Sequence, residues 1–297
     1  MLLMSKIKGI YAASVSILKD NLTLNIEKTS NHIENLIDEG CHGVVVFGST
    51  GQAQLIPISE KIELLNNLSL SKYKDNFIIG TGLNSLGETI NLMKIATSLK
   101  FKKFLIMPPA FYKYGDNEVI NFYSRLIEAN HECEILLYNF EKLSGYKFSL
   151  DCIYELVKKF PKQIIGIKDS SYNIFEKLKL DNFSVLPGSE LKLLKCLELG
   201  CSGIITATGN VTTQMSRKVY DDFLNGEKQT VYQKLCEVRL IFEKYNLISA
   251  LHSYLSKNDE IFKNVLPPIQ LLSKEDQKQL FESLQKINFL KKSKIAA

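Results

Sequence analysis

The sequence of 297 residues predicts an α/β fold, a (β/α)8 TIM barrel with a C-terminal helical extension. Two observations support this prediction. Short apolar runs alternate with segments of helical periodicity, and all eight strand-like runs come before Asn225. Eight strand–helix units of this length suit a closed barrel, which typically needs roughly 250 residues. A doubly wound open sheet is the alternative fold.

Eight segments have the composition of buried strands. Val44-Val45-Val46-Phe47 and Phe104-Leu105-Ile106-Met107 are near-continuous apolar runs, as expected of parallel strands covered on both faces. The predicted strands are residues 7–17, 43–48, 76–82, 103–108, 134–139, 163–168, 183–188 and 202–207.

Helical segments lie between these strands. In residues 150–160 the apolar side chains recur at the helical spacing of i, i+3, i+4 and i+7. Ser149 is the expected N-cap of this helix, and Pro161 follows its end. Residues 190–199 carry a similar stripe of leucines, and Gly200 is the expected C′ residue.

The chain changes character after Asn225, where the strand-like runs stop. Residues 227–245, 249–257 and 273–290 are predicted helices. No low-complexity linker or internal repeat marks a second independent domain. We therefore expect a barrel over 1–225 and a helical extension over 226–297 that packs on the barrel or on a partner subunit.

Composition narrows the class of protein. With 45% hydrophobic and 23% charged residues, the chain has the composition of an ordinary globular protein. The net charge of +5 is spread along the chain, so nucleic-acid binding is not indicated. Residues 1–6 are too short for a secretory h-region, and no apolar run approaches a membrane span. We expect a cytoplasmic protein without a membrane or nucleic-acid partner.

The cysteines and histidines do not form a metal-binding pattern. The six cysteines contain no CxxC pair, and the four histidines are scattered along the chain. Most of the cysteines are expected to be small core residues. We predict no metal site.

Lys168 stands at the end of an apolar run, residues 163–168, before the chain breaks into small polar residues. Because this run is predicted to be a buried strand, its lysine sits at the mouth of a core, where desolvation disfavours the ammonium form. A neutral amine attacks a carbonyl carbon and forms a Schiff base. The alternative is a lysine that extends from a strand end into water.

The carboxyl ends of the strands of such a barrel meet at one mouth, where active sites lie. Tyr138 ends the strand next to that of Lys168, so we expect its phenol within hydrogen-bond reach of the amine. Ser49 and Thr50, in a glycine-flanked turn, are expected to extend a proton relay, while N–H groups of the turn bind a carboxylate. The alternatives are an ordinary turn and a core aromatic. The turns after strands seven and eight could bind a phosphate.

One cofactor motif is excluded. Gly80-Thr81-Gly82 resembles the start of a dinucleotide fingerprint, but Ser85 replaces the third glycine. Lys102 and Lys103 stand where that motif needs an acid. We predict neither a nicotinamide site nor a P-loop.

These motifs together resemble those of the dihydrodipicolinate synthase and N-acetylneuraminate lyase family, the pyruvate-dependent class I aldolases. The resemblance covers nearly the whole chain. Its most specific marks are Gly48-Ser49-Thr50-Gly51, Tyr138-Asn139, residues 166–169 and residues 203–210.

The resemblance implies a lyase that reversibly joins pyruvate to an aldehyde. Lys168 is expected to form the Schiff base, with Tyr138 and Thr50 as catalytic partners. The implied substrate-binding residues are Ser49, Thr50, Gly51, Gly188 and Ile205. No metal or other cofactor is required, because the protonated imine is itself the electron sink. Family members are commonly tetramers, so a homotetramer is expected.

Three residues depart from the synthase pattern. Leu143 replaces the arginine that binds the distal carboxylate of the synthase's aldehyde, Gln52 replaces an acid, and Phe111 replaces a tyrosine. Loss of a bidentate guanidinium should cost about 2–5 kcal/mol of binding. The sequence therefore favours a 2-keto-3-deoxy sugar-acid aldolase over 4-hydroxy-tetrahydrodipicolinate synthase acting on aspartate semialdehyde. An alternative of another class is a non-catalytic barrel that binds a 2-oxo acid.

Overall fold

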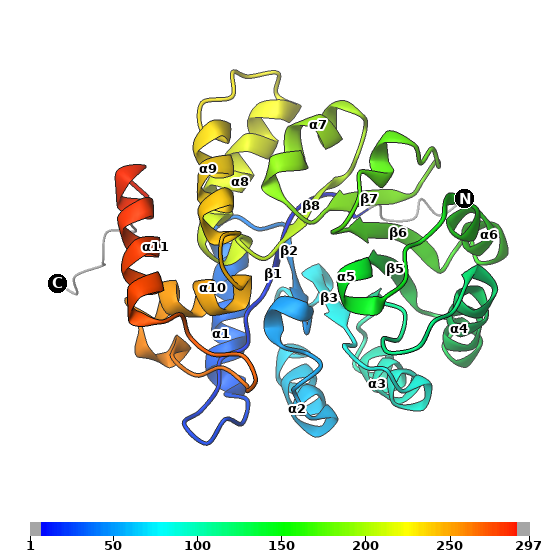
Figure 1. Cartoon of the computed structure of the whole chain (residues 1–297). Helices are drawn as coiled ribbons and strands as arrows, with labels where there is room; N and C mark the ends of the chain where they lie inside the picture. Colours follow the sequence, from blue (N-terminus) through cyan, green and yellow to red (C-terminus); the bar gives the residue numbers. More distant parts are fainter. Residues whose placement is uncertain (1–6, 290–297) are drawn as a thin grey trace.

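The computed structural model describes residues 7–289 and confirms the predicted (β/α)8 barrel. Figure 1 shows the strands at the centre and the helices around them. The eight strands are β1 (Gly9–Ala13), β2 (Gly43–Val46), β3 (Phe77–Gly80), β4 (Lys103–Ile106), β5 (Glu134–Asn139), β6 (Ile164–Asp169), β7 (Ser184–Pro187) and β8 (Gly203–Thr206).

All paired strands of the barrel run parallel, in the order β7-β6-β5-β4-β3-β2-β1-β8. Within residues 7–289, no ladder joins β7 to β8. The two strands are linked at their base by one backbone hydrogen bond, from Ser202 N to Val185 O at 3.0 Å. The barrel is therefore nearly closed, with a seam between its seventh and eighth strands.

Each predicted strand is present, and β1 is shorter than the predicted 7–17. The reason is that, after the N–H of Ser14 donates to Val45 O at 3.1 Å, side chains replace the neighbouring strand as hydrogen-bond acceptors. The N–H of Val15 donates to Asn210 Oδ1 at 3.0 Å, and the N–H of Ile17 donates to Thr29 Oγ1 at 3.1 Å. An apolar run therefore extended the prediction past the point where strand pairing stops.

The helices of the barrel follow the strands on the outside. They are α1 (Ile26–Asp38), α2 (Ile58–Leu68), α3 (Leu86–Ser98), α4 (Asp116–Ala129), α5 (Glu141–Ser144), α6 (Leu150–Lys159), α7 (Leu193–Glu198) and α8 (Gly209–Leu224). Ser149 caps α6 as predicted, because its hydroxyl accepts the N–H of Cys152 at 2.9 Å. Gly200 follows α7 with φ +84°, the left-handed conformation expected at C′.

The C-terminal segment contains α9 (Tyr232–Phe242), α10 (Leu247–Ser256) and α11 (Lys274–Lys286). The helix predicted over 227–245 begins later, and that over 249–257 begins earlier because the Asn246 side chain caps the N–H groups of Ile248 and Ser249. Residue 290, the predicted end of the last helix, lies outside the described residues.

The buried apolar side chains of residues 7–289 form three clusters. The largest lies between the strands and α1–α8, and a smaller one fills the inside of the barrel and includes Tyr138, Leu186 and Ile205. The third joins α9, α10 and α11 to Val15 and Ile17 beside the barrel (Figure 1). Apolar side chains of the barrel and of residues 226–289 share this cluster, which supports the division at 225 that we propose.

Candidate active site

Lys168 and Tyr138 meet inside the barrel mouth, as expected. They are direct partners in the register of β5 and β6, so both side chains point to the same face of the sheet. The Lys168 side chain is buried, and its Nζ donates to the Tyr138 hydroxyl at 3.4 Å. The same Nζ lies 4.4 Å from the centre of the Tyr138 ring. The lysine therefore does not extend into water.

Ser49 continues this chain of polar groups. Its hydroxyl lies 3.1 Å from the Tyr138 hydroxyl, on the first residue of the 3₁₀ turn η1 (Ser49–Gly51). In the described part of the chain, no hydrogen bond joins Thr50 to Tyr138. A relay from Lys168 through Tyr138 thus passes to Ser49, and the catalytic role expected of Thr50 stays a prediction.

The turn that carries Ser49 is tightly packed. A Cβ on Gly51 would lie 2.9 Å from the Ser14 carbonyl oxygen, so the position suits glycine alone. Gln52 follows with φ +55°, and its Oε1 accepts the N–H of Leu266 at 2.7 Å. Gln52, which replaces the family's acid, thus connects the C-terminal segment to the turn through a hydrogen bond.

Asp169 fixes the break in the chain that follows Lys168. Its carboxylate accepts the N–H groups of Ser171, Tyr172 and Ile174, at 3.3, 3.1 and 3.0 Å, and also the Asn139 amide at 3.0 Å. A carboxylate that accepts several N–H groups holds a turn firmly. The sequence analysis gave Asp169 no role, although its position directly after a buried strand is a signal for such a cap.

Gly188 directly follows β7, and Ile205 lies in β8. The Gly188 N–H donates to Asp169 O at 2.9 Å, and a Cβ on Gly188 would lie 2.4 Å from Ser170 Oγ. Ile205 is fully buried in the cluster that contains Tyr138. Gly188 lines the cavity that contains Lys168, whereas the described lining of that cavity does not include Ile205. The substrate-binding role of both residues stays a prediction.

Two cavities at the mouth share part of their lining. The cavity that contains Lys168 has a volume of about 300 Å³, and its lining includes Tyr138 and Gly188. The second has a volume of about 670 Å³, and among the described residues its lining contains no charged side chain. Leu143 and Phe111 belong to this second lining. The cavities share Ser49, Thr50, Phe140 and Leu247.

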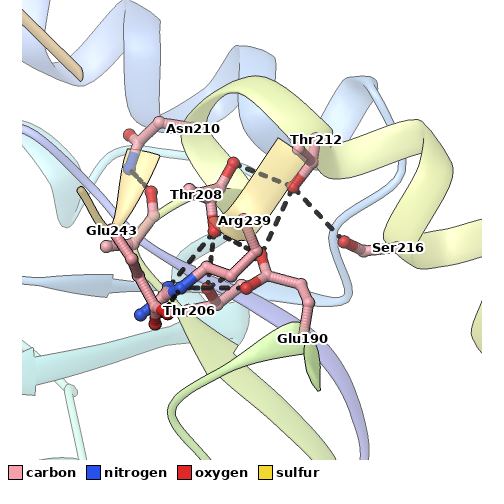
Figure 2. Close-up of polar contacts among 9 residues, drawn as sticks. Glu190, Thr206, Thr208, Asn210, Thr212, Ser216, Arg239 and Glu243 are labelled. Atoms are coloured by element: carbon pink, nitrogen blue, oxygen red, sulfur yellow. Dashed lines mark hydrogen bonds and ion pairs between the residues drawn. The ribbon is translucent and has the colours of Figure 1, made fainter. Parts of the chain in front are cut away.

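An ion-pair cluster that the sequence does not predict borders the Lys168 cavity, and its members Glu190 and Arg239 are buried. Figure 2 shows Arg239 of α9 between Glu190 and Glu243. Arg239 Nε donates to Glu243 Oε1 at 2.6 Å, and Nη1 lies 3.4 Å from Glu190 Oε2. The hydroxyls of Thr206 and Thr208 are directed at the Glu190 carboxylate. Because these hydroxyls already donate hydrogen bonds to a carboxylate, we do not assign a phosphate site to the turns after strands seven and eight.

A second buried lysine lies in α2. Lys61 of α2 is fully buried, and its Nζ donates to Thr81 O at 2.7 Å. Burial lowers the pKa of Lys61 to about 8. The sequence does not predict the burial of Lys61, because its position in an amphipathic helix is ordinary for a lysine.

The excluded motifs stay unassigned. Ser85 caps α3 through the N–H of Glu88, so the residue that replaces the third glycine has a structural contact.

Within residues 7–289, no group of three or more His, Cys, Asp or Glu side chains is arranged to hold a metal ion. Over the same residues, no helix has the length and apolar character needed to cross a bilayer.

Comparison with known proteins gives a family over nearly the whole chain. The model of the Dihydrodipicolinate synthetase family matches residues 6–287. A 4-hydroxy-tetrahydrodipicolinate synthase from Methanoculleus marisnigri is 26% identical over 276 residues, which cover 89% of this chain and 92% of that protein. A 2-dehydro-3-deoxy-D-gluconate/2-dehydro-3-deoxy-phosphogluconate aldolase from Picrophilus torridus is 26% identical over 255 residues, which cover 82% of this chain and 94% of that protein.

Solved structures agree on the fold. A prophage protein of the dihydrodipicolinic acid synthase family from E. coli K12, in complex with pyruvate, superposes with a TM-score of 0.87. The sequence identity is 23%, and the match covers 95% of this chain and 99% of that one.

Proposed function

Because the chain belongs to the Dihydrodipicolinate synthetase family of class I aldolases and lyases, we propose that it joins or splits pyruvate and an aldehyde through an imine at Lys168. The observation that carries this proposal is the buried chain of Lys168 Nζ, Tyr138 OH and Ser49 Oγ, with separations of 3.4 and 3.1 Å. A nucleophile and a proton-transfer group within such reach are what covalent catalysis at a carbonyl needs.

In the cleavage direction, the Lys168 amine adds to the C2 carbonyl of the 2-oxo acid, and the adduct takes up one proton from solvent and loses water to give a protonated imine, a proton that the final hydrolysis returns. The Tyr138–Ser49 pair accepts the proton of the C4 hydroxyl while the C3–C4 bond breaks. The electron pair of that bond moves toward the imine nitrogen, which gives an enamine and a free aldehyde. The proton then returns to C3, and water releases pyruvate and the Lys168 amine.

The Ser49 turn is suited to hold the carboxylate of the 2-oxo acid. The first N–H groups of a helical turn have no partner within that turn and attract anions. In η1 the internal hydrogen bonds begin at Gly51 N, which leaves the N–H groups of Ser49 and Thr50 outside them. We propose that Ser49, Thr50 and Gly51 bind the carboxylate, and that Gly188 and Ile205 enclose the imine.

The second cavity supports an uncharged hydroxy-aldehyde as the partner of pyruvate. Its described lining combines apolar side chains with the amides of Gln54, Asn84 and Asn246, and Leu143 stands where the synthase pattern has arginine. Aspartate semialdehyde carries two charges, and their burial there would cost free energy without a partner. We therefore propose a 2-keto-3-deoxy sugar-acid aldolase, the activity named for the Picrophilus torridus relative.

A direct assay ranks the two substrates. The purified protein is given 2-keto-3-deoxygluconate, and released pyruvate is followed by coupled oxidation of NADH. Condensation of pyruvate with aspartate semialdehyde is measured in parallel, and Lys168→Arg is the matched control for both reactions. We expect faster turnover of the sugar acid and none by the variant. Higher kcat/KM for aspartate semialdehyde would favour the synthase instead, as the name of the Methanoculleus relative suggests.

The proposal also covers the oligomeric state and the cellular location of the protein. We propose a homotetramer, a state common among proteins with these motifs, and a cytoplasmic enzyme. The side chains of Phe111 and Tyr112 are 89% and 80% exposed at the barrel mouth, which is apolar surface that an assembly would cover. Light scattering during size-exclusion chromatography should give four chain masses, and a single chain mass would contradict the tetramer.

A further inference from the structure

The barrel lacks strand pairing at one place beside the candidate site. Every other neighbouring pair of strands shares a parallel ladder, but in residues 7–289 β7 and β8 share none. A backbone hydrogen bond from Ser202 N, directly before β8, to Val185 O of β7 lies at the amino end of the seam. At the carboxyl end, where Gly188 follows β7, side chains must hold the two strands together.

Glu190 occupies that carboxyl end. The side chain is fully buried, and its Oε1 accepts the hydroxyls of Thr206, Thr208 and Thr212 at 2.9, 2.5 and 3.5 Å. Thr206 ends β8, whereas Thr208 and Thr212 belong to the start of α8. Figure 2 shows these hydroxyls converging on one carboxylate. Glu190 therefore bridges the turn after β7 to the neighbouring strand and helix across the seam.

Arg239 supplies the charge partner of Glu190. Its Nη1 lies 3.4 Å from Glu190 Oε2 and also donates to Thr206 and Thr208, at 3.2 and 3.3 Å. A fully buried carboxylate is tolerated only when it is paired and hydrogen-bonded. This arrangement fixes Glu190 in one position, and it ties α9 to the same seam.

The turn held by Glu190 reaches the Lys168 cavity on its other side. Gly188 packs against Ser170, and its N–H is bonded to Asp169 O at 2.9 Å. Ser189 lines the cavity that contains Lys168, and within the described residues its buried hydroxyl has no partner. A shift of Glu190 would therefore move Gly188 and Ser189 relative to the reacting amine.

We propose that Glu190 is a positioning residue, which clasps β7 to β8 across the unpaired seam and so holds Gly188 and Ser189 against the Lys168 site. The catalytic part of this inference rests on the proposed imine function, and the clasp itself does not. The free Ser189 hydroxyl is then available to a hydroxyl or carbonyl of the bound 2-oxo acid.

Hydrogen exchange tests the clasp without any substrate. Amide exchange is followed by mass spectrometry in wild type, Glu190→Gln and Glu190→Ala. The matched control is Asp222→Asn, which removes a buried carboxylate of α8 that pairs with Lys218 at 2.9 Å and does not line the site cavities. We expect faster exchange in residues 184–192 and 203–208 of the alanine variant, a smaller change with glutamine, and none there in the control.

The rate of imine trapping tests the positioning. Each protein is mixed with pyruvate and quenched with borohydride at set times, well below its unfolding temperature. Misplacement of reacting groups by about 1 Å can cost on the order of 100-fold in rate. We expect the maximal trapping rate of Glu190→Ala to fall by about 10- to 100-fold, with partial rescue in Glu190→Gln, because its amide oxygen still accepts the threonine hydroxyls.

The outcomes separate the two proposals. Unchanged exchange in 184–192 would overturn the clasp whatever the enzyme does. Faster exchange with wild-type trapping rates would overturn the positioning role. If wild-type protein itself formed no adduct with pyruvate, the imine function would fail while the exchange data still decided the clasp. If Asp222→Asn lowered the trapping rate as much as Glu190→Gln, the effect of Glu190 on that rate would come from general stability and not from positioning.

Discussion

Proton transfer in the proposed reaction depends on one hydroxyl, that of Tyr138, which lies 3.4 Å from Lys168 Nζ and 3.1 Å from Ser49 Oγ. Tyr138→Phe keeps the ring and removes this group. Because a positioned general acid–base contributes about 10²- to 10⁴-fold, we expect kcat to fall by that factor in a folded protein. Tyr123→Phe is the control, since its hydroxyl bonds Ile106 O away from the cavity. Equal losses in both variants would contradict the role of Tyr138.

Lys61 gives a prediction about pH and stability. Burial lowers its pKa from 10.5 to about 8, so between these values the unfolded chain holds a proton that the folded chain has released. The free energy of unfolding therefore rises with pH across this window, on the order of 3 kcal/mol for the full shift. Below pH 8 the buried ammonium form imposes the whole penalty.

Lys61→Met keeps the length of the side chain and removes the titration. We expect the wild type to gain stability relative to this variant as pH increases from 8 to 10, measured by urea denaturation at several pH values. A constant difference between the two proteins across that range would show that Lys61 does not titrate there.

The sequence alone was sufficient to predict a contact between two residues when chemically suitable side chains lie near the ends of adjacent strands. Lys168 and Tyr138 are the penultimate residues of the adjacent strands β6 and β5, and their contact followed from that position. Whether Ser49 or Thr50 contacts the Tyr138 hydroxyl depends on the path of a three-residue turn, which the sequence pattern does not determine. Glu190 and Arg239 are 49 positions apart and come from a turn and an outer helix, so no spacing in the sequence connects them.

At the scale of elements, the turn after β7 depends on a glycine that touches its neighbour. A Cβ at position 188 would meet Ser170 Oγ at 2.4 Å and Ser170 Cα at 3.1 Å. We expect Gly188→Ala to cost about 1–3 kcal/mol of stability through overpacking, and to slow imine formation. Thermal unfolding and borohydride trapping measure the two effects.

The matched glycine for this test is Gly87, in the first turn of α3. An added Cβ there meets nothing within 4 Å. Gly87→Ala should leave imine formation unchanged and stabilise the protein by about 0.5–1 kcal/mol, because alanine favours the helix. A destabilised Gly87→Ala together with a neutral Gly188→Ala would contradict the packing account of the β7 turn.

Elements were predictable where burial and periodicity agree. Several strands, such as β2 and β3, are near-continuous apolar runs, and the capping residue Ser149 fixed the start of α6 at Leu150. The end of β1 was not predictable, because Val15 and Ile17 stay apolar and buried while their N–H groups bond to side chains. Residues 190–199 form a 3₁₀ turn and then α7, since Glu190 is held toward β8.

At the scale of the whole molecule, the C-terminal helices complete the wall of the site. Arg239, Glu243 and Leu247 line the cavity that contains Lys168, although they lie beyond the eighth strand in sequence. The sequence analysis identified the helices and gave them no part in the site. Their apolar cluster, which includes Leu280 and Tyr254, holds α11 against α9 and α10.

Leu280→Ala tests this packing. The side chain is fully buried, and truncation of a buried leucine costs about 2–5 kcal/mol. We expect one cooperative transition in denaturant at a lower midpoint, with imine formation kept at low temperature. Leu240→Ala removes a leucine of α9 that is 49% exposed, and should change stability by no more than about 0.5 kcal/mol. Separate transitions for helices and barrel would show that the extension is not part of one cooperative unit.

The most direct measurement of the whole account is the site of covalent attachment. The protein is incubated with pyruvate and borohydride, digested, and its peptides are analysed by tandem mass spectrometry. We predict one reduced pyruvate adduct, on Lys168, and none in Tyr138→Phe at short times when the wild type is already modified. An adduct on Lys61 or another lysine, or none at all in folded wild-type protein, would contradict Lys168 as the Schiff-base nucleophile.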